Sequence, residues 1–421
     1  MLYFVLIIGF IIRLFYAVVL VPQDIVGDAF EYDTIAVNIV QGNGFSMDSC
    51  NPTAIRGPVY PYLIATIYKI FGHSYLAVRM FQVLISVLSC FLVYKISKAI
   101  FEITENANYT EKIAIASSFL FALYPSFIIY TGMIYTETLF IFLLLFSMFC
   151  LIQVFKADKF WLWMILSGIS LGFTSLCRTT TILFPIFLIA IIYLYNLFKK
   201  DLVFKKVILM KILLVFILSI LTIVPWTIRN DVAFKKFIPV MTRVGQNLWG
   251  GNYIPYDGYW DVWTNKVSRE EFTNTMNTIT KGYYGIDADE ILLREGIKNI
   301  IQNPWGTFLL GLKKMYRFWI FPVGSGFIAE KGLSLLSKII MIPHIIILIF
   351  GGIGMYFGMC KNKLSMLLVA IIFYYTFAHT VFLVVPRYHL PIMPYVLIFA
   401  VYGVYKIIKI KSPLPPFIKG A

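Results

Sequence analysis

Long apolar stretches constrain this chain more than any other feature of its sequence. Each is long enough to cross a hydrocarbon core about 30 Å thick. Lipid offers an open backbone no hydrogen-bond partner, so such stretches are expected to be α-helices. The sequence therefore predicts an all-α polytopic membrane protein, a bundle of about ten transmembrane helices with external loops and a small external segment. The predicted spans are residues 2–20, 76–100, 113–131, 136–155, 161–177, 180–198, 207–225, 334–357, 364–385 and 389–408.

The basic residues indicate how the chain is oriented. The net charge is +15, but the sequence has no compact Lys/Arg block with interleaved aromatic residues, so a nucleic-acid partner is not expected. Lysines gather instead in short connections between apolar runs, which is typical of cytoplasmic loops. This pattern predicts ten spans, both termini in the cytoplasm and a multi-pass protein of the plasma (inner) membrane. The lysines concerned include Lys95, Lys98, Lys112, Lys156, Lys159, Lys199, Lys200, Lys205, Lys206, Lys361, Lys363, Lys406, Lys409 and Lys411.

Two long segments, 21–75 and 226–333, then lie on the external side together with most of the acidic residues. The chain divides into an N-terminal bundle (1–225, including the loop 21–75), the external segment 226–333 and C-terminal helices (334–421). The charged stretch 305–322 is interpreted as an interfacial amphipathic helix. The alternative, that it spans the membrane and inverts everything after it, stays open. Polar residues concentrated on one face favour chemistry on the external side.

Three acids follow the first apolar stretch in "VGDAFEYD". Helical spacing places Glu31 on the same face as Asp28, whereas Asp33 points away and is expected to serve solubility. Asp28 has two interpretations: a surface acid that compensates a helix dipole, or a catalytic carboxylate at the lipid–water boundary.

One arginine lies in the external loop, and a further acid and two more arginines stand at the outer ends of predicted spans. Arg56 lies in a Pro- and Gly-rich turn, where its guanidinium could grip a phosphate or only extend toward lipid head groups. Glu137 opens the fourth span, Arg178 follows the fifth and Arg387 precedes the last. A Glu137–Arg178 pair would be structural, but arginines converging on one outer face would form a site for an anionic group.

Further candidates for a substrate pocket lie nearby in the sequence. They are Tyr32, Tyr60, Arg229, Asn230 and Asn247, the last within "GQNLWGGN". The cysteines and histidines show no metal-ligand spacing, so the sequence predicts neither a zinc site nor a disulfide framework.

An ordered set of motifs resembles one family. The stretches are "GDAFEYDTIAVNIVQGNGF", "TAIRGPVYPYLIATIYKIFG", "YTETLF", "GISLGFTSLCRTTTILFP", "VPWTIRN", "FIPVMTRVGQNLWGGN" and "PRYHLPIMPYVLIFAVYG". In this order they resemble glycosyltransferases of the GT-C fold. The specific relatives are the dolichyl-phosphate-mannose–protein mannosyltransferase-like enzymes and the lipid A aminoarabinose transferases.

The resemblance implies an inverting transfer of a sugar from a polyprenyl-phosphate donor to an acceptor hydroxyl on the external face. Asp28 matches the family's loop acid and would be the general base. Glu31 and Glu137 are candidate assisting acids, and Arg56, Arg387 and Arg178 would bind the donor phosphate.

One departure concerns metal binding. Some relatives carry a metal-binding acid before the loop's basic residue, where this chain has Ile55. No metal ion is therefore assigned, and a divalent metal is the only cofactor left to consider.

The acceptor (protein, lipid or glycan) stays open. The main alternative function is a transporter or flippase of a lipid-linked anionic sugar, which would use the same arginines without a base. The third is a structural membrane subunit without activity.

Overall fold

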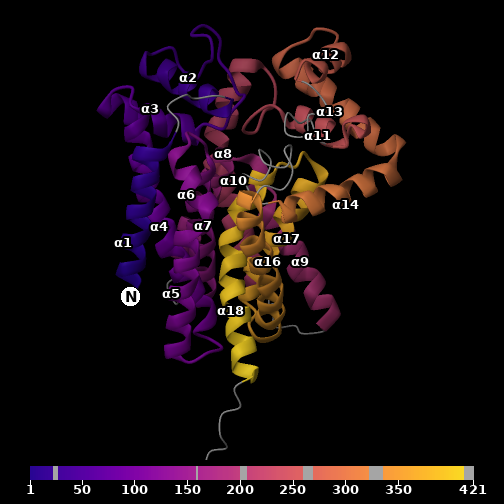
Figure 1. The fold of residues 1–421 in the computed structure, drawn as a ribbon. Helices are drawn as coiled ribbons and strands as arrows, with labels where there is room; N and C mark the ends of the chain where they lie inside the picture. The colour runs from indigo at the N-terminus through magenta and orange to yellow at the C-terminus, as the bar shows by residue number, and fades with distance from the viewer. Residues whose placement is uncertain (22–26, 158–159, 200–205, 259–268, 322–334, 412–421) are drawn as a thin grey trace, which may run out of the picture.

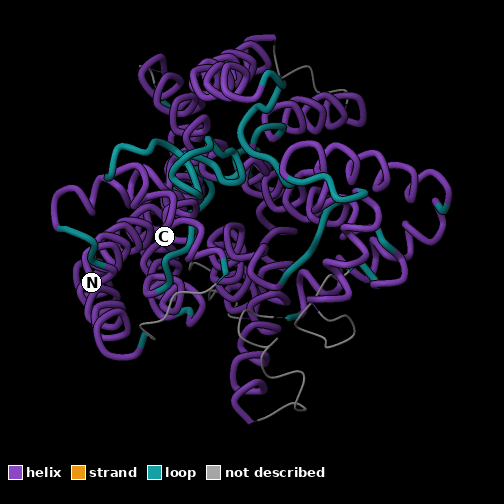
Figure 2. The backbone as a smooth tube through the Cα atoms, turned by 90° about the horizontal axis from the view of Figure 1, so that it is seen from above, coloured by secondary structure: helices purple, strands orange, loops and turns teal. Residues whose placement is uncertain are grey.

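The computed structural model describes residues 1–21, 27–157, 160–199, 206–258, 269–321 and 335–411. Within these ranges the chain is almost entirely helical, and the only β-type pairing is an isolated bridge between Ser46 and Pro52. Figure 2, which looks down on the bundle, shows helices joined by loops, with no strand among the residues that it describes. Parts of the predicted connections and of the external segment, at 200–205, 259–268 and 322–334, lie outside the described residues.

Seven helical segments are long and apolar enough to cross a membrane in the part of the chain that the structure describes. An eighth is bent: α5 and α6 meet at an angle of 51° where Pro125 begins α6. The predicted spans at 180–198 and 364–385 correspond to α9 and α17, which have 16 and 17 residues. The seven are α1 with η1 (Leu2–Phe15, Tyr16–Leu20), α4 (Tyr75–Phe101), α7 (Glu137–Lys156), α8 (Phe160–Cys177), α10 (Lys206–Phe234), α16 (Leu335–Lys361) and η4 with α18 (Pro386–Ile392, Met393–Lys411). The others are α5 (Ala107–Leu123), α6 (Pro125–Gly132), α9 (Phe184–Lys199) and α17 (Ser365–Val381).

The predicted fold class, an all-α polytopic membrane protein with about ten transmembrane helices, is confirmed.

The helices pack closely where small residues permit it. A Cβ atom on Gly172 of α8 would lie 2.5 Å from the Thr222 Cβ of α10, so this crossing depends on glycine. The bundle is therefore a packed body that can hold side chains in fixed positions at its end.

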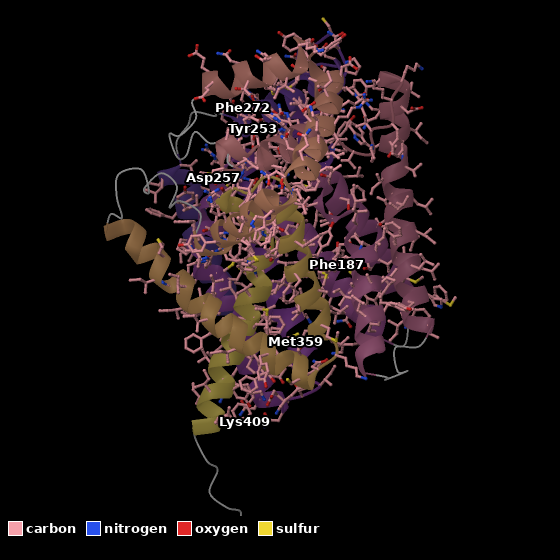
Figure 3. All side chains as sticks on the ribbon, turned by 90° about the vertical axis from the view of Figure 1, so that its right-hand side faces the viewer. Phe187, Tyr253, Asp257, Phe272, Met359 and Lys409 are labelled. Atoms are coloured by element: carbon pink, nitrogen blue, oxygen red, sulfur yellow. The ribbon has the colours of Figure 1, made fainter. Side chains whose placement is uncertain are left out.

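The remaining helices gather at one end of the bundle (Figure 1). They are α2 (Asp28–Val40), α3 (Val59–Phe71), η2 (Thr179–Thr181), α11 (Val244–Asn252), η3 (Ile254–Tyr256), α12 (Arg269–Thr280), α13 (Gly285–Gln302) and α14 (Pro304–Ile320). Figure 3 places Asp257 and Phe272 at this end and Met359 and Lys409 at the other. Helices α12 and α13 are separated at 281–284, and α14 begins at Pro304.

Helix α14 carries the charges of the segment read as interfacial, and it is not among the helices that could span a membrane. Its apolar residues Trp305 and Phe308 are exposed, but Lys314 is fully buried. The Lys314 ammonium donates to the carbonyl oxygens of Gly251, at 2.9 Å, and Phe382, at 3.2 Å. Burial lowers the pKa of Lys314 to about 7. This lysine joins α14 to the ends of α11 and α17. The interfacial position of α14 stays a prediction, and so does the division of the chain into three parts.

Candidate active site

Helix α2 presents two acids on one face because of where it begins. Gly27 precedes it with φ of +61°, a backbone conformation that favours glycine, and Asp28 is the first helical residue. Glu31 follows three residues later, so both carboxylates lie over the same turn. Both reach the side chain of Arg56.

Arg56 is held in place by a close backbone contact beside it. A Cβ atom on Gly57 would lie 2.2 Å from the carbonyl oxygen of Leu176, so only glycine lets this turn approach the end of α8. From there Arg56 Nη2 binds Asp28 Oδ1 at 2.5 Å and Arg56 Nε binds Glu31 Oε2 at 2.6 Å. Its guanidinium carbon also lies 4.9 Å from the ring centre of Tyr32.

Arg387 and Arg178 complete the other half of the cluster. Arg387 at the start of η4 donates to the second oxygen of Asp28, and its Nε lies 3.7 Å from Glu137 Oε1. Arg178 Nη2 binds the same Glu137 oxygen at 2.6 Å, and its Nε donates to Thr136 Oγ1 at 2.8 Å. Residues predicted from five separate stretches of the sequence therefore meet at one end of the bundle.

Arg243 adds a fourth guanidinium that the sequence analysis did not single out. It lies immediately before α11 with φ of +73°, and its Nη2 binds Glu31 Oε1 at 2.9 Å. The cluster is thus a chain of alternating charges, here called the ion-pair chain, in which each carboxylate stands between two guanidiniums. Its members in order are Arg243, Glu31, Arg56, Asp28, Arg387, Glu137 and Arg178. With four arginines and three acids, the ion-pair chain has an excess of one positive charge.

The electrostatics at Asp28 are decided by its two arginines. Burial alone would raise the pKa of Asp28, but the nearby Arg387 and Arg56 outweigh it and hold the pKa well below its usual range. In this arrangement Asp28 is fully ionised but a weak base. Its basicity would increase if another anion drew the two guanidiniums away.

Glu137 has spare hydrogen-bonding capacity. Its side chain is 1% exposed, and Oε2 has no hydrogen-bond partner among the described residues. The other oxygen, Oε1, is shared by Arg178 and Arg387. A buried carboxylate oxygen without a partner is unusual in a native protein, and a catalytic role or a bound water or ion is among its ordinary explanations.

The predicted pocket tyrosines lie against the ion-pair chain. Tyr32 and Tyr60 pack edge to face with ring centres 5.0 Å apart. The Tyr60 hydroxyl donates to Gln82 Oε1 at 2.8 Å, and Tyr60 is fully buried. Tyr32 therefore borders the guanidinium of Arg56, whereas Tyr60 supports Tyr32 from behind.

Arg229 and Asn230 engage backbone carbonyl groups. Arg229 Nη1 donates to the Thr53 carbonyl at 2.8 Å, and Asn230 Nδ2 donates to the Ile238 carbonyl at 3.0 Å. Both lie on α10, where Arg229 holds the loop before α3 and Asn230 holds the loop after α10. Asn247 is partly buried on α11. The Asn247 backbone N–H donates to the Arg243 carbonyl oxygen at 3.0 Å. The role of Arg229, Asn230 and Asn247 in a substrate pocket stays a prediction.

The expectation for Asp33 was wrong. Its side chain is 12% exposed and accepts a hydrogen bond from the Tyr68 hydroxyl at 2.6 Å, so it is not a surface acid that serves solubility. Helical spacing correctly placed it away from Asp28, but could not reveal that another helix packs there.

The donor set at this site does not fit a divalent metal ion. No group of three His, Cys, Asp or Glu side chains in the described ranges could hold one. The oxygens of Asp28 and Glu31 are already bound by guanidiniums, whose positive charge opposes a further cation.

Part of the chain, with some of the residues of this site, matches a known protein family. Residues 55–227 match the sequence model of the family described as dolichyl-phosphate-mannose-protein mannosyltransferase. The resemblance read from the sequence motifs is confirmed. The matched range begins one residue before Arg56 and includes Glu137 and Arg178. No protein of curated function matches the sequence.

Solved structures show the same fold. The apo oligosaccharyltransferase of Archaeoglobus fulgidus superposes with a TM-score of 0.60 and 14% identity, over 97% of this chain and 50% of that one. A second structure from the same organism is AglB with an inhibitory peptide and a dolichol-phosphate. It superposes with a TM-score of 0.56 and 14% identity, over 98% of this chain and 52% of that one. For ArnT from Cupriavidus metallidurans bound to undecaprenyl phosphate, the TM-score is only 0.44, with 12% identity over 99% of this chain and 80% of that one. The chain thus has a GT-C fold and spans about half the length of the archaeal enzyme.

Proposed function

We propose that this protein is a membrane glycosyltransferase that moves a sugar from a polyprenyl-phosphate donor to an acceptor hydroxyl. The observation that carries the proposal is the ion-pair chain: an acid in a candidate base position, held between two arginines, in a cluster with excess positive charge. The match to the mannosyltransferase family and the GT-C fold support the same reaction class.

Binding of the donor would rearrange the arginines. A lipid phosphate competes with the Asp28 carboxylate for Arg56 and Arg387, and both guanidiniums can bind a phosphate in a bidentate manner. When they turn to the phosphate, Asp28 loses the charges that depress its pKa and becomes a stronger base. The donor itself would thus activate the base.

The transfer step follows from these positions. Asp28 accepts the proton of the acceptor hydroxyl while that oxygen forms a bond to the anomeric carbon of the sugar. The bond from this carbon to the phosphate oxygen breaks, and polyprenyl phosphate leaves with the electron pair and an additional negative charge. Arg56 and Arg387 stabilise that charge. Attack opposite the leaving phosphate inverts the anomeric centre.

The site is assigned to the extracytoplasmic face of the plasma (inner) membrane. This assignment rests on the lysine-rich connections, which belong on the cytoplasmic side. Lys98, Lys156 and Lys409 lie at the end of the bundle opposite α2 and α11–α13, where Figure 3 labels Lys409.

A turnover assay tests the proposal. Protein purified in detergent receives undecaprenyl-phosphate sugars of several kinds and a panel of protein, lipid and glycan acceptors, and release of free undecaprenyl phosphate is measured. We expect acceptor-dependent release that Asp28→Asn abolishes and that Asp48→Asn, at an exposed acid of the same external loop, leaves intact. Release unaffected by Asp28→Asn would contradict the assignment of the base. No release with any donor would contradict the enzyme and favour a transporter.

A further inference from the structure

The carboxylate of Asp33 is bound by residues outside the ion-pair chain. Its Oδ1 accepts from the Tyr68 hydroxyl at 2.6 Å and from His73 Nε2–H at 2.8 Å. The Tyr75 hydroxyl reaches Oδ2 at 3.3 Å. Three donors on one largely buried carboxylate satisfy its charge and hold it in a fixed place.

The three donors also form a packed aromatic group. The ring of His73 stands edge-on to Tyr68, with centres 4.7 Å apart, and to Tyr75, with centres 5.1 Å apart. Tyr68 belongs to the last turn of α3, His73 to the turn that follows, and Tyr75 begins α4. Asp33 therefore fastens α2 to the junction between α3 and α4.

The carboxylates of α2 make two attachments to the segment from Arg56 to Tyr75, and this is the second of them; the rings of Tyr32 and Tyr60 also pack between α2 and α3. The first joins Asp28 and Glu31 to Arg56, three residues before α3 begins. Asp33 is five residues beyond Asp28, which is about 7.5 Å along the helix and about 140° around it. Two attachments at different heights and on different sides prevent both sliding and rotation of α2.

We propose that Asp33 is a positioning residue that fixes where α2 presents Asp28 to the acceptor. This inference rests on the proposed glycosyl transfer. When the donor phosphate draws Arg56 and Arg387 away from Asp28, the first attachment is weakened at the moment of catalysis. The Asp33 attachment involves neither arginine and keeps α2 in place. A displacement of about 1 Å can lower a rate by up to about 100-fold.

The test compares Asp33→Asn with the matched control Asp48→Asn, which makes the same change at an exposed position of the same loop. Two readouts are used: kcat and donor KM for release of undecaprenyl phosphate, and hydrogen–deuterium exchange of the α2 amides. We expect Asp33→Asn to lower kcat by about tenfold or more, to change donor KM less than about twofold and to speed exchange in α2. A second variant, Tyr68→Phe, removes the 2.6 Å donor and keeps the ring; we expect a smaller loss of the same kind.

Each result decides the proposal. A folded Asp33→Asn protein with unchanged kcat would overturn the role of Asp33, and so would a loss of kcat without faster exchange in α2. Faster exchange throughout the protein would show a general stabilising role and also overturn it. If the unsubstituted protein turns over no donor, the proposed function itself fails. An active protein that is indifferent to Asp33→Asn removes the positioning role alone.

Discussion

Two buried charge clusters at opposite ends of the molecule differ in how their carboxylates are satisfied. At the lower end, Glu105 takes hydrogen bonds from Tyr402 at 3.2 Å and Tyr405 at 2.9 Å, and pairs with Lys406 and Lys409. All of these donors converge on one acid from a single helix, α18. The Glu105 cluster is thus a closed arrangement that fastens the end of α18 to the segment after α4.

The ion-pair chain has a different organisation. Its carboxylates alternate with guanidiniums drawn from four stretches of the sequence, it begins and ends with an arginine, and Glu137 Oε2 has no hydrogen-bond partner among the described residues. The comparison teaches that burial and pairing alone do not identify a functional site. Both clusters have one more cation than anion; planar guanidiniums from separate stretches and the unpartnered Glu137 Oε2 distinguish the ion-pair chain from the Glu105 cluster within the described residues.

The largest difference between the clusters is expected in the response to losing one cation. Arg387→Gln should lower the kcat/KM for donor turnover by about 10²- to 10³-fold, because one donor to the leaving phosphate is lost. Lys406→Gln in the Glu105 cluster should leave kcat/KM unchanged. Steady-state release of undecaprenyl phosphate measures both. Equal losses of kcat/KM in the two variants would contradict the distinction between a functional ion-pair chain and a structural Glu105 cluster.

Replacing arginine by lysine tests geometry apart from charge. Arg387→Lys keeps the positive charge but loses the planar fork that serves Asp28 and a phosphate together. We expect an intermediate loss of kcat/KM, about tenfold, in the same assay. Full activity of Arg387→Lys would show that only charge matters at this position.

Glu105→Gln should affect stability and not turnover. The amide cannot neutralise Lys406 and Lys409, and we expect a loss of about 1–3 kcal/mol in the free energy of unfolding. Thermal unfolding in detergent measures the loss, and kcat at a temperature well below the transition provides the control. A drop in kcat without a drop in stability would contradict the structural assignment of this cluster.

The smallest effect concerns pH. Because the pKa of Asp28 in the folded protein lies well below its ordinary value, its stabilising contribution is present above the unfolded pKa of about 3.9. That contribution is lost as the pH falls from there toward the folded pKa. Asp28→Asn should therefore weaken the acid dependence of unfolding below about pH 4. An unchanged acid dependence would mean that the two arginines do not hold the ionised form.

The sequence predicted the helical membrane fold because long apolar runs have no other stable arrangement in lipid. It also placed Asp28 and Glu31 on one face, since spacing within a helix is a local property. The Glu137–Arg178 pair was considered from their positions at the ends of consecutive spans, and the structure contains it.

The partners that sequence analysis missed depend on distant segments. Arg243 meets Glu31 from 212 residues away, and nothing near either residue indicates that contact. Asp33 was assigned to solvent because periodicity gives the direction of a side chain but not what packs against it. The hydrogen-bond donors of "GHSY" were the available signal for a partner of Asp33. They could be matched to Asp33 only once the structure showed α2 beside α3.

Binding of undecaprenyl phosphate, without a sugar, tests the central claim most directly. The claim is that Asp28 and the donor phosphate compete for Arg56 and Arg387. Asp28→Asn should then bind undecaprenyl phosphate at least as tightly as the unsubstituted protein, while turnover of the sugar donor is lost. If Asp28→Asn weakens binding of undecaprenyl phosphate together with turnover, the carboxylate does not compete with the phosphate, and the account given for the ion-pair chain is wrong.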